Sequence, residues 1–160
     1  MRPTPGRRGF TITEMLVTVA ILAILAGAAI PLAQNSIKRE KEIELSRSLR
    51  LMREAIDAYK RLADEKKIKT EQDAEGYPPD LQTLVKGVEV SGGSREGASE
   101  KRTIRFLRRI PKDPMTNSFD WGLRSSQDGP DSDSWGGENV YDVYTKSRGK
   151  ALDGSKYRDW

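Results

Sequence analysis

A run of sixteen residues without a charge, Met15–Ile30, constrains this chain more than any other feature. With its flanks the run reaches about 20 apolar residues, a length that can cross a bilayer as a helix or serve as a secretory signal. Hydrophobic residues make up only 36% of the 160 residues and charged residues 32%, so the remainder is unusually polar. The sequence therefore predicts an apolar N-terminal segment followed by one modest polar domain.

The composition excludes several classes of protein. Because the chain has no Cys and no His, it has no disulfide framework, no Cys/His zinc site, no Cys nucleophile and no His-based catalytic triad. It also lacks a nucleotide-binding loop of the Gly-x-x-x-x-Gly-Lys-Ser/Thr type. We therefore predict a protein that is not an enzyme and requires no cofactor.

The net charge of +4 is concentrated at the N-terminus. Arg2, Arg7 and Arg8 precede the apolar run, so a chain without Met1–Gly9 would carry 4 − 3 = +1. A nearly neutral domain is a poor electrostatic partner for nucleic acid, so we expect no nucleic-acid partner. A basic leader is typical of the end that a bacterial inner membrane keeps in the cytoplasm.

A single carboxylate, Glu14, stands at the start of the apolar run. Inserting a charge there costs about 2–3 kcal/mol on membrane-insertion scales. In one interpretation Glu14 lies at the membrane interface without a role, and in the other it has an ionic partner. A secretory signal cleaved at Ala26-Gly27-Ala28, which would release a periplasmic binding protein, is an alternative that Glu14 disfavours.

The segment from Arg8 to Val17, RGFTITEMLV, resembles the class III signal of the type IV pilin superfamily. The resemblance implies that a prepilin peptidase/methyltransferase cuts after Gly9 on the cytoplasmic face and N-methylates Phe10. The apolar helix would then be retained as a membrane anchor. Pro31 also matches the family, so Phe10, Glu14 and Pro31 are the expected assembly residues.

The charges at a cleaved N-terminus agree with that resemblance. Cleavage would leave a cationic amine on Phe10, about one helical turn from Glu14. In a stack of subunits, Glu14 can instead face the amine of a neighbour. Because an unpaired charge is costly at low dielectric, this pairing would set the register of the subunits.

The polar part of the chain begins with a helical pattern. Apolar residues recur at spacings of 4, 3, 4, 3 and 4, which places them on one face of a helix. They are Leu45, Leu49, Met52, Ile56, Tyr59 and Ala63. We expect a helix from Phe10 to about Lys67, kinked or locally melted at Pro31. The predicted organisation is a leader at 1–9, a transmembrane and filament-core helix at 10–33, and a periplasmic domain at 34–160.

Short elements are expected after the helix. Asp80 is a predicted N-cap of a short helix. The other segments are a mobile loop at 91–101, a short helix or strand at 104–110, strands at 119–121 and 140–144, and a loop at 125–139. The predicted fold class is α+β, with a long N-terminal helix packed on a small antiparallel β-sheet.

Several parts of this domain look like the major pseudopilins of type II secretion systems: Tyr77–Leu81, Phe106–Pro114, Asn117 and the tail from Val140–Thr145 through Leu152–Gly154 to Asp159–Trp160. The resemblance implies a pilin-like fold and a helical homopolymer that helps drive exoproteins through an outer-membrane secretin. The implied partners are minor pseudopilins and an inner-membrane assembly platform with its ATPase. The alternative is a type IV pilin for adhesion, motility or DNA uptake, although many of those carry a C-terminal Cys pair.

The family resemblance also implies a calcium loop after the last strand, here Thr145–Ser155. Leu152 and Asp153 are the candidate ligands, whereas Arg148 stands where the family usually has an Asp. Since Ca²⁺ takes six to eight oxygen ligands, this replacement removes one of them. A second acidic cluster lacks the spacing of an EF-hand and is interpreted as a solvated loop: Asp128, Asp131, Asp133 and Glu138.

Overall fold

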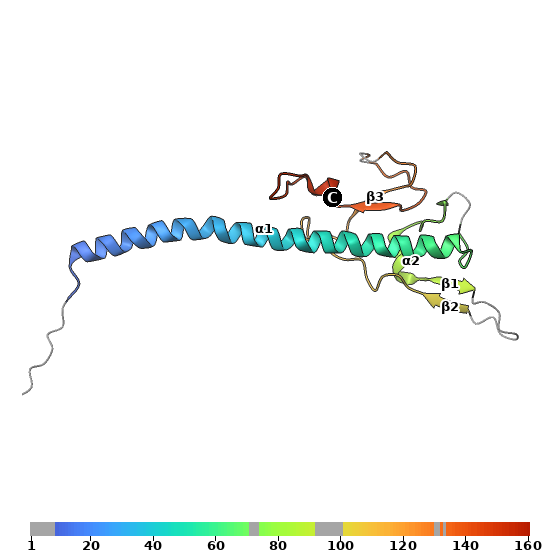
Figure 1. Cartoon of the computed structure of the whole chain (residues 1–160), viewed down its shortest axis with the longest axis horizontal. Helices are drawn as coiled ribbons and strands as arrows, with labels where there is room; N and C mark the ends of the chain where they lie inside the picture. Colours follow the sequence, from blue (N-terminus) through green and yellow to red (C-terminus); the bar gives the residue numbers. More distant parts are fainter. Residues whose placement is uncertain (1–8, 71–73, 92–100, 130–131, 133) are drawn as a thin grey trace, which may run out of the picture. The chain divides into compact units, whose positions relative to one another are not determined.

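The computed structural model of the chain describes residues 9–70, 74–91, 101–129, 132 and 134–160. Helix α1 (Ile12–Asp64) contributes to two compact units, which meet between Arg39 and Glu40. The remaining elements belong to the second unit (Figure 1). They are α2 (Leu81–Lys86), β1 (Val88–Ser91), β2 (Lys101–Ile104), β3 (Gly122–Arg124), β4 (Asp142–Tyr144) and the 3₁₀ helix η2 (Tyr157–Asp159). The predicted α+β class is confirmed.

The part of α1 that lies in the first unit is predominantly apolar. No charged residue occurs between Glu14 and Lys38, a stretch of 23 residues that extends about 35 Å as a helix. Its mean hydropathy reaches 2.5 and none of the most apolar window is buried. Large side chains such as Ile12 (81% exposed) and Ile24 (72%) have no protein cover. Within the described residues, α1 is the one helix long and apolar enough to cross a membrane.

Pro31 lies inside α1, which continues through it without interruption. A proline removes one backbone hydrogen bond, but the turns on either side keep theirs. Of the two outcomes predicted at Pro31, local melting is therefore wrong, and a kink stays a prediction.

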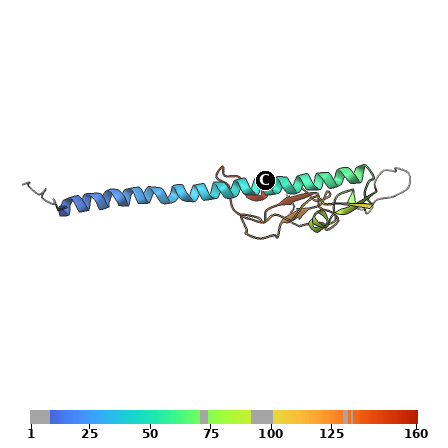
Figure 2. The ribbon, with the colours of Figure 1, turned by 90° about the horizontal axis from the view of Figure 1, so that it is seen from below.

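In the second unit, one stripe of α1 forms the core. Leu45 and Met52 are fully buried and Ile56 is 1% exposed, while Leu51, on the opposite face, is 47% exposed. Figure 2 shows α2 and the strands along one side of this part of the helix. They contribute Leu84, Val90 and Val143 to the same core. The periodicity read from the sequence thus identified the buried face.

Helix α1 ends at Asp64, three residues before the predicted end. Lys66 adopts a left-handed conformation (φ 54°). The amide of Lys66 donates to Ala63 O at 2.9 Å and that of Lys67 to Leu62 O at 3.0 Å. This pair of bonds is a Schellman motif, which stops a helix by turning the chain back over its last carbonyls. Because its left-handed residue is Lys rather than Gly, the sequence carried no clear stop signal.

Helix α2 has the predicted cap. The Oδ1 atom of Asp80 accepts a hydrogen bond from the Thr83 amide at 2.6 Å. At the other end, Gly87 has φ 85°, and a Cβ there would approach the carbonyl oxygen of Ile104 to 2.5 Å. Only glycine fits this close passage between α2 and β2.

The predicted single sheet is replaced by two antiparallel pairs, β1–β2 and β3–β4. In the first pair Val88, the first residue of β1, faces Ile104, the last residue of β2. The sequence predicted a strand or helix that begins at this residue. That prediction for 104–110 is wrong, because the Phe106 and Leu107 amides both donate to Leu84 O at 3.0 Å. The predicted loop at 91–101 is flanked by these strands, and its central residues 92–100 lie outside the described residues.

The second pair confirms one predicted strand and corrects the other. β4 lies within the predicted range 140–144, whereas the predicted strand 119–121 is wrong. Phe119 is 63% exposed, and pairing starts at Gly122, which faces Tyr144. A Cβ at Gly122 would collide with the Tyr144 ring. The tyrosine ring thus occupies the space that a side chain at position 122 would need.

The buried stripe predicts a matched pair of leucine substitutions. Leu45→Ala should lower the free energy of unfolding by about 2–5 kcal/mol, because it leaves a cavity in the core. Leu51→Ala, on the exposed face of the same helix, should change it by about 0.5 kcal/mol or less. Chemical unfolding of the full chain in detergent micelles, followed by tryptophan fluorescence, measures both. Equal effects of the two substitutions would contradict the assignment of the buried face.

Candidate functional site

The predicted cleavage site lies just ahead of α1. Gly9 and Phe10 are non-helical, and Phe10 is 76% exposed. Nothing lies within 4 Å of a Cβ placed on Gly9. The bond between the two residues is thus held neither by helical hydrogen bonds nor by side-chain packing. Most of the predicted leader, residues 1–8, lies outside the described residues, and processing at Gly9 stays a prediction.

Glu14 lies in the first turn of α1. The hydroxyl of Thr11 accepts a hydrogen bond from the Glu14 amide at 3.2 Å, and Thr11 O accepts one from Met15 N at 3.1 Å. Thr11 is therefore the N-cap, and Glu14 occupies the position where a carboxylate offsets the partial positive charge of the helix start. The structure gives Glu14 a local role, in addition to the inter-subunit role predicted from the sequence.

The surface of the first unit is the second part of the candidate site. A helix that is apolar on all sides is stable where lipid or other helices surround it. Two hydroxyls within it donate to their own helix: Thr18 Oγ1 donates to Met15 O at 2.9 Å, and Ser36 Oγ donates to Leu32 O at 3.1 Å. Polar groups satisfied by their own helix fit an apolar environment. Pro31 lies within this segment, but its predicted role in assembly is untested.

The candidate calcium residues lie in the loop after β4. Asp153 Oδ1 accepts hydrogen bonds from the Ser155 hydroxyl at 2.7 Å and from the Ser155 amide at 2.9 Å. These bonds lower the pKa of Asp153, since they favour the ionised carboxylate. The Leu152 amide donates to Glu42 Oε1 at 2.9 Å. The Asp153 carboxylate is thus engaged within its own turn, and the Leu152 main chain is fixed to α1.

The charges around this loop oppose a cation. Arg148 is exposed and lines a 240 Å³ cavity together with Lys146 and Arg158, and no carboxylate lines that cavity. Among the described residues, no cluster of three or more Asp, Glu, His or Cys side chains could hold a metal ion. Because Ca²⁺ requires six to eight oxygens and is repelled by guanidinium groups, the residues present do not fit the implied calcium ion.

Of the second acidic cluster, the structure describes Asp128 and Glu138. Asp128 Oδ2 accepts hydrogen bonds from the Ser125 amide at 2.7 Å and the Gly136 amide at 3.1 Å. These backbone contacts lower the pKa of Asp128. Asp131 and Asp133 lie outside the described residues. Asp128 therefore joins Ser125 to Gly136 across the loop that contains all three residues.

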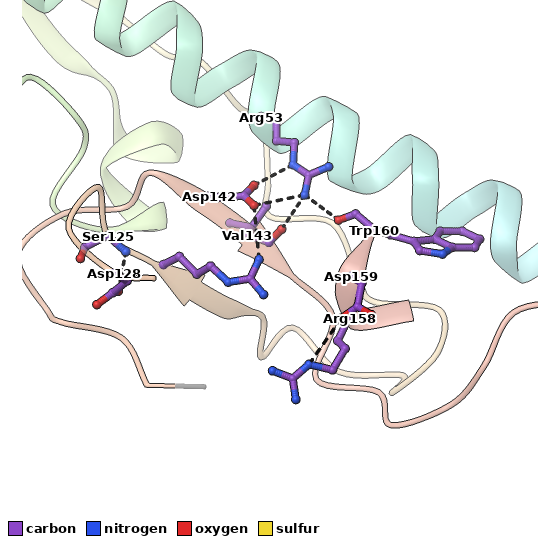
Figure 3. A network of polar contacts seen from close by, with 9 residues as sticks. Arg53, Ser125, Asp128, Asp142, Val143, Arg158, Asp159 and Trp160 are labelled. Carbon is purple, nitrogen blue, oxygen red and sulfur yellow. Dashed lines mark hydrogen bonds and ion pairs between the residues drawn. The ribbon is translucent and has the colours of Figure 1, made fainter. Parts of the chain in front are cut away.

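Three polar residues that sequence reasoning missed hold the second unit together. Arg53, on α1, binds Asp142 at the start of β4 and the main-chain oxygen of Trp160 (Figure 3). Glu42, also on α1, accepts hydrogen bonds from Leu152 and Tyr157. Asp113 is fully buried and accepts a hydrogen bond from Thr145 Oγ1 at 2.5 Å.

A sequence signal existed for two of them. Glu42 lies three residues before Leu45, at the N-terminal end of the apolar stripe, and Arg53 follows Met52 within it. A charged residue beside a buried stripe indicates a tertiary partner. The identity of that partner could be found only in the structure, since it lies 89 or more residues away.

The chain matches one family model and is similar to two curated proteins. Residues 4–30 match the family model of the prokaryotic N-terminal methylation motif. The chain is 30% identical over 120 residues to the type II secretion system core protein G of Escherichia coli. This alignment covers 74% of each chain. It is also 29% identical over 115 residues to the type II secretion system core protein G of Aeromonas hydrophila. That alignment covers 69% of each chain. No solved structure matches the chain at a significant level.

The contact between Glu42 and Tyr157 predicts a loss of stability at high pH. Burial, followed by the hydrogen bond to Glu42, raises the pKa of Tyr157 from 10.0 to about 12. The folded protein thus favours the neutral phenol, so this contribution is complete below pH 10 and is lost as the pH rises to about 12. Unfolding measured from pH 9 to 12 should show a weaker pH dependence in Tyr157→Phe than in the unmodified chain. Tyr141→Phe, at a half-exposed ring, is the control, and equal slopes for all three proteins would contradict the assignment.

Proposed function

The chain belongs to the family of the type II secretion system core protein G, and on this premise we propose how it works as a structural subunit of the secretion pseudopilus. The observation that carries the proposal is the contrast within α1. One half is apolar on all sides and unburied, and the other half has a single buried stripe. The apolar surface of the first half would be buried by lipid in a membrane or by neighbouring helices in a filament core.

The apolar half fits a single-pass inner-membrane protein. We propose that the N-terminus faces the cytoplasm and the second unit faces the periplasm. Arg2, Arg7 and Arg8 support this orientation, because basic residues are retained on the cytoplasmic side of a membrane helix. The span of 23 uncharged residues is long enough for the hydrocarbon core, which is about 30 Å thick.

Processing would change the charge at the helix start. Cleavage after Gly9 by a prepilin peptidase/methyltransferase removes the three leader arginines and creates a methylated amine on Phe10. That amine adds positive charge at the end of α1 that is already partially positive. Glu14, the acidic residue of the first turn, is the group that can neutralise it. Within a filament, the amine of one subunit would pair with Glu14 of the next.

This pairing explains how an unfavourable carboxylate can direct assembly. Association of apolar helices has little directional preference in itself, because lipid tails are as apolar as the side chains. A buried unpaired charge is costly, so the subunits stop sliding where amine and carboxylate meet. Glu14 would thereby set the register of the homopolymer.

The remaining partners follow from the proposed role. A growing filament in the periplasm would push exoproteins through an outer-membrane secretin, with minor pseudopilins at its tip. The sequence has no nucleotide-binding loop, so the energy would come from the ATPase of the inner-membrane assembly platform. The subunit itself would act by polymerisation and perform no catalysis.

The charge-pairing proposal predicts that Glu14→Ala separates processing from assembly. The variant should be cleaved, methylated and inserted like the unmodified protein, because removing a charge favours insertion. It should fail to form filaments, because the Phe10 amine of each neighbour loses its partner. N-terminal sequencing with mass spectrometry measures processing, and sedimentation with electron microscopy measures filaments after co-expression with the secretion system.

Glu40→Ala is the matched control, since Glu40 is an exposed carboxylate on the same helix. It should be processed and should assemble normally. Normal filaments from Glu14→Ala would disprove the charge pairing while leaving family membership intact. A mature chain that starts near Ala29 would contradict the retained anchor, and long surface fibres in place of short periplasmic ones would favour a type IV pilin.

A further inference from the structure

The loop that follows β4 is fixed to α1 by two side chains of the helix. We propose that Glu42 and Arg53 lock the C-terminal loop, Thr145–Trp160, onto α1, and that this chain folds its loop without a calcium ion. The proposal concerns the second unit alone and does not depend on filament assembly.

Glu42 holds the loop at two separate points. Its Oε1 atom accepts a hydrogen bond from the Leu152 amide at 2.9 Å and one from the Tyr157 hydroxyl at 2.8 Å. Both bonds end on an ionised acceptor, and such bonds are stronger than neutral ones. The Tyr157 ring is 4% exposed and packs edge-on against Trp160, with ring centroids 5.4 Å apart. One carboxylate thus fixes the turn at Leu152 and the helix η2 together.

Arg53 holds both ends of the same loop. Its Nε atom donates to Asp142 Oδ1 at 2.7 Å, and its Nη2 atom lies 3.3 Å from Asp142 Oδ2. The same Nη2 donates to the main-chain oxygen of Trp160 at 2.7 Å and to that of Val143 at 3.3 Å (Figure 3). The guanidinium therefore joins β4, where the loop begins, to the last residue.

The two locking residues lie on one face of α1. Glu42 and Arg53 are eleven positions apart, and eleven residues make just over three helical turns. Both consequently border the buried stripe that includes Leu45 and Leu49. The rigid helix presents an anion and a cation at a fixed spacing, and the loop supplies donors and acceptors that match them.

The loop closes its own turn through main-chain contacts. The Ala151 amide donates to Ser155 O at 2.8 Å, and Gly154, with φ 89°, donates to Ala151 O at 3.1 Å. Asp153 accepts both hydrogen bonds of Ser155. At the start of the loop, Thr145 Oγ1 donates to the buried Asp113. These contacts provide the organisation that a bound cation would otherwise give a loop of this kind.

The distribution of charge argues against the cation itself. The cavity beside Thr145–Arg148 is lined by three cationic side chains, those of Lys146, Arg148 and Arg158, and by no carboxylate. A divalent cation entering this region would meet Arg148 in place of an oxygen ligand. The loop is therefore adapted to a metal-free state.

The first experiment tests whether calcium stabilises the full chain, which is held in detergent micelles. Thermal unfolding is followed by tryptophan fluorescence with calcium chloride or with a chelator, and hydrogen exchange is measured for peptides of the loop by mass spectrometry. We expect the same melting temperature and the same loop exchange under both conditions. A bound calcium ion would raise the melting temperature by several degrees, and that result would overturn the metal-free proposal.

The lock is tested by Glu42→Ala, with Glu44→Ala as the matched control. Glu44 is an exposed residue on the same helix, so both changes alter helix propensity equally. We expect Glu42→Ala to lower the melting temperature by several degrees and to speed exchange at Leu152 and η2 about tenfold, since it removes two charge-assisted hydrogen bonds. Glu44→Ala should do neither. Identical behaviour of the two variants would overturn the role of Glu42.

A milder variant covers the case in which Glu42→Ala does not fold. Tyr157→Phe keeps the buried ring and removes one of the two hydrogen bonds to Glu42. It should speed exchange in the loop, whereas Tyr141→Phe should leave it unchanged. Unchanged exchange in Tyr157→Phe would count against the lock.

Discussion

The packing of one α1 stripe against the rest of the second unit is the interaction on which this structure depends. The strands are only three or four residues long and form two separate pairs, and isolated pairs of this length are unstable in water. They persist because Leu45, Met52 and Ile56 give them a shared apolar surface. The helix is thus a template on which short elements assemble, and its N-terminal half is the proposed membrane anchor.

The polar contacts of the second unit are also organised by α1. Glu42 and Arg53 reach residues that are far away in the sequence, and each makes more than one bond. Such multiple contacts restrict the loop more than single surface ion pairs do, which contribute little. The C-terminal loop is therefore ordered by side chains of the helix, a property that distinguishes this chain from the calcium-binding arrangement implied by its family resemblance.

The N-terminal part of α1 follows a different physical rule. Its large side chains are apolar and exposed around the whole helix, a pattern that is stable where lipid or other helices surround it. Glu14 combines two roles at its start. It offsets the partial charge of the helix terminus in a single chain, and in a filament it is the proposed partner of a neighbouring amine. One carboxylate can serve both roles because both involve positive charge at the same helix end.

The sequence by itself determined the long helix, its apolar half, its buried stripe, the Asp80 cap and the family, since all of these depend on local periodicity or on adjacent residues. It failed where distant residues decide the outcome. The strand predicted at 119–121 begins instead at Gly122, where the Tyr144 ring occupies the space of a side chain, and the segment 104–110 is irregular because its amides bond to Leu84. The partners of Glu42, Arg53 and Asp113 likewise lie far away in the chain. Tertiary structure alone decides such contacts, because a charged side chain does not encode which distant backbone group will meet it.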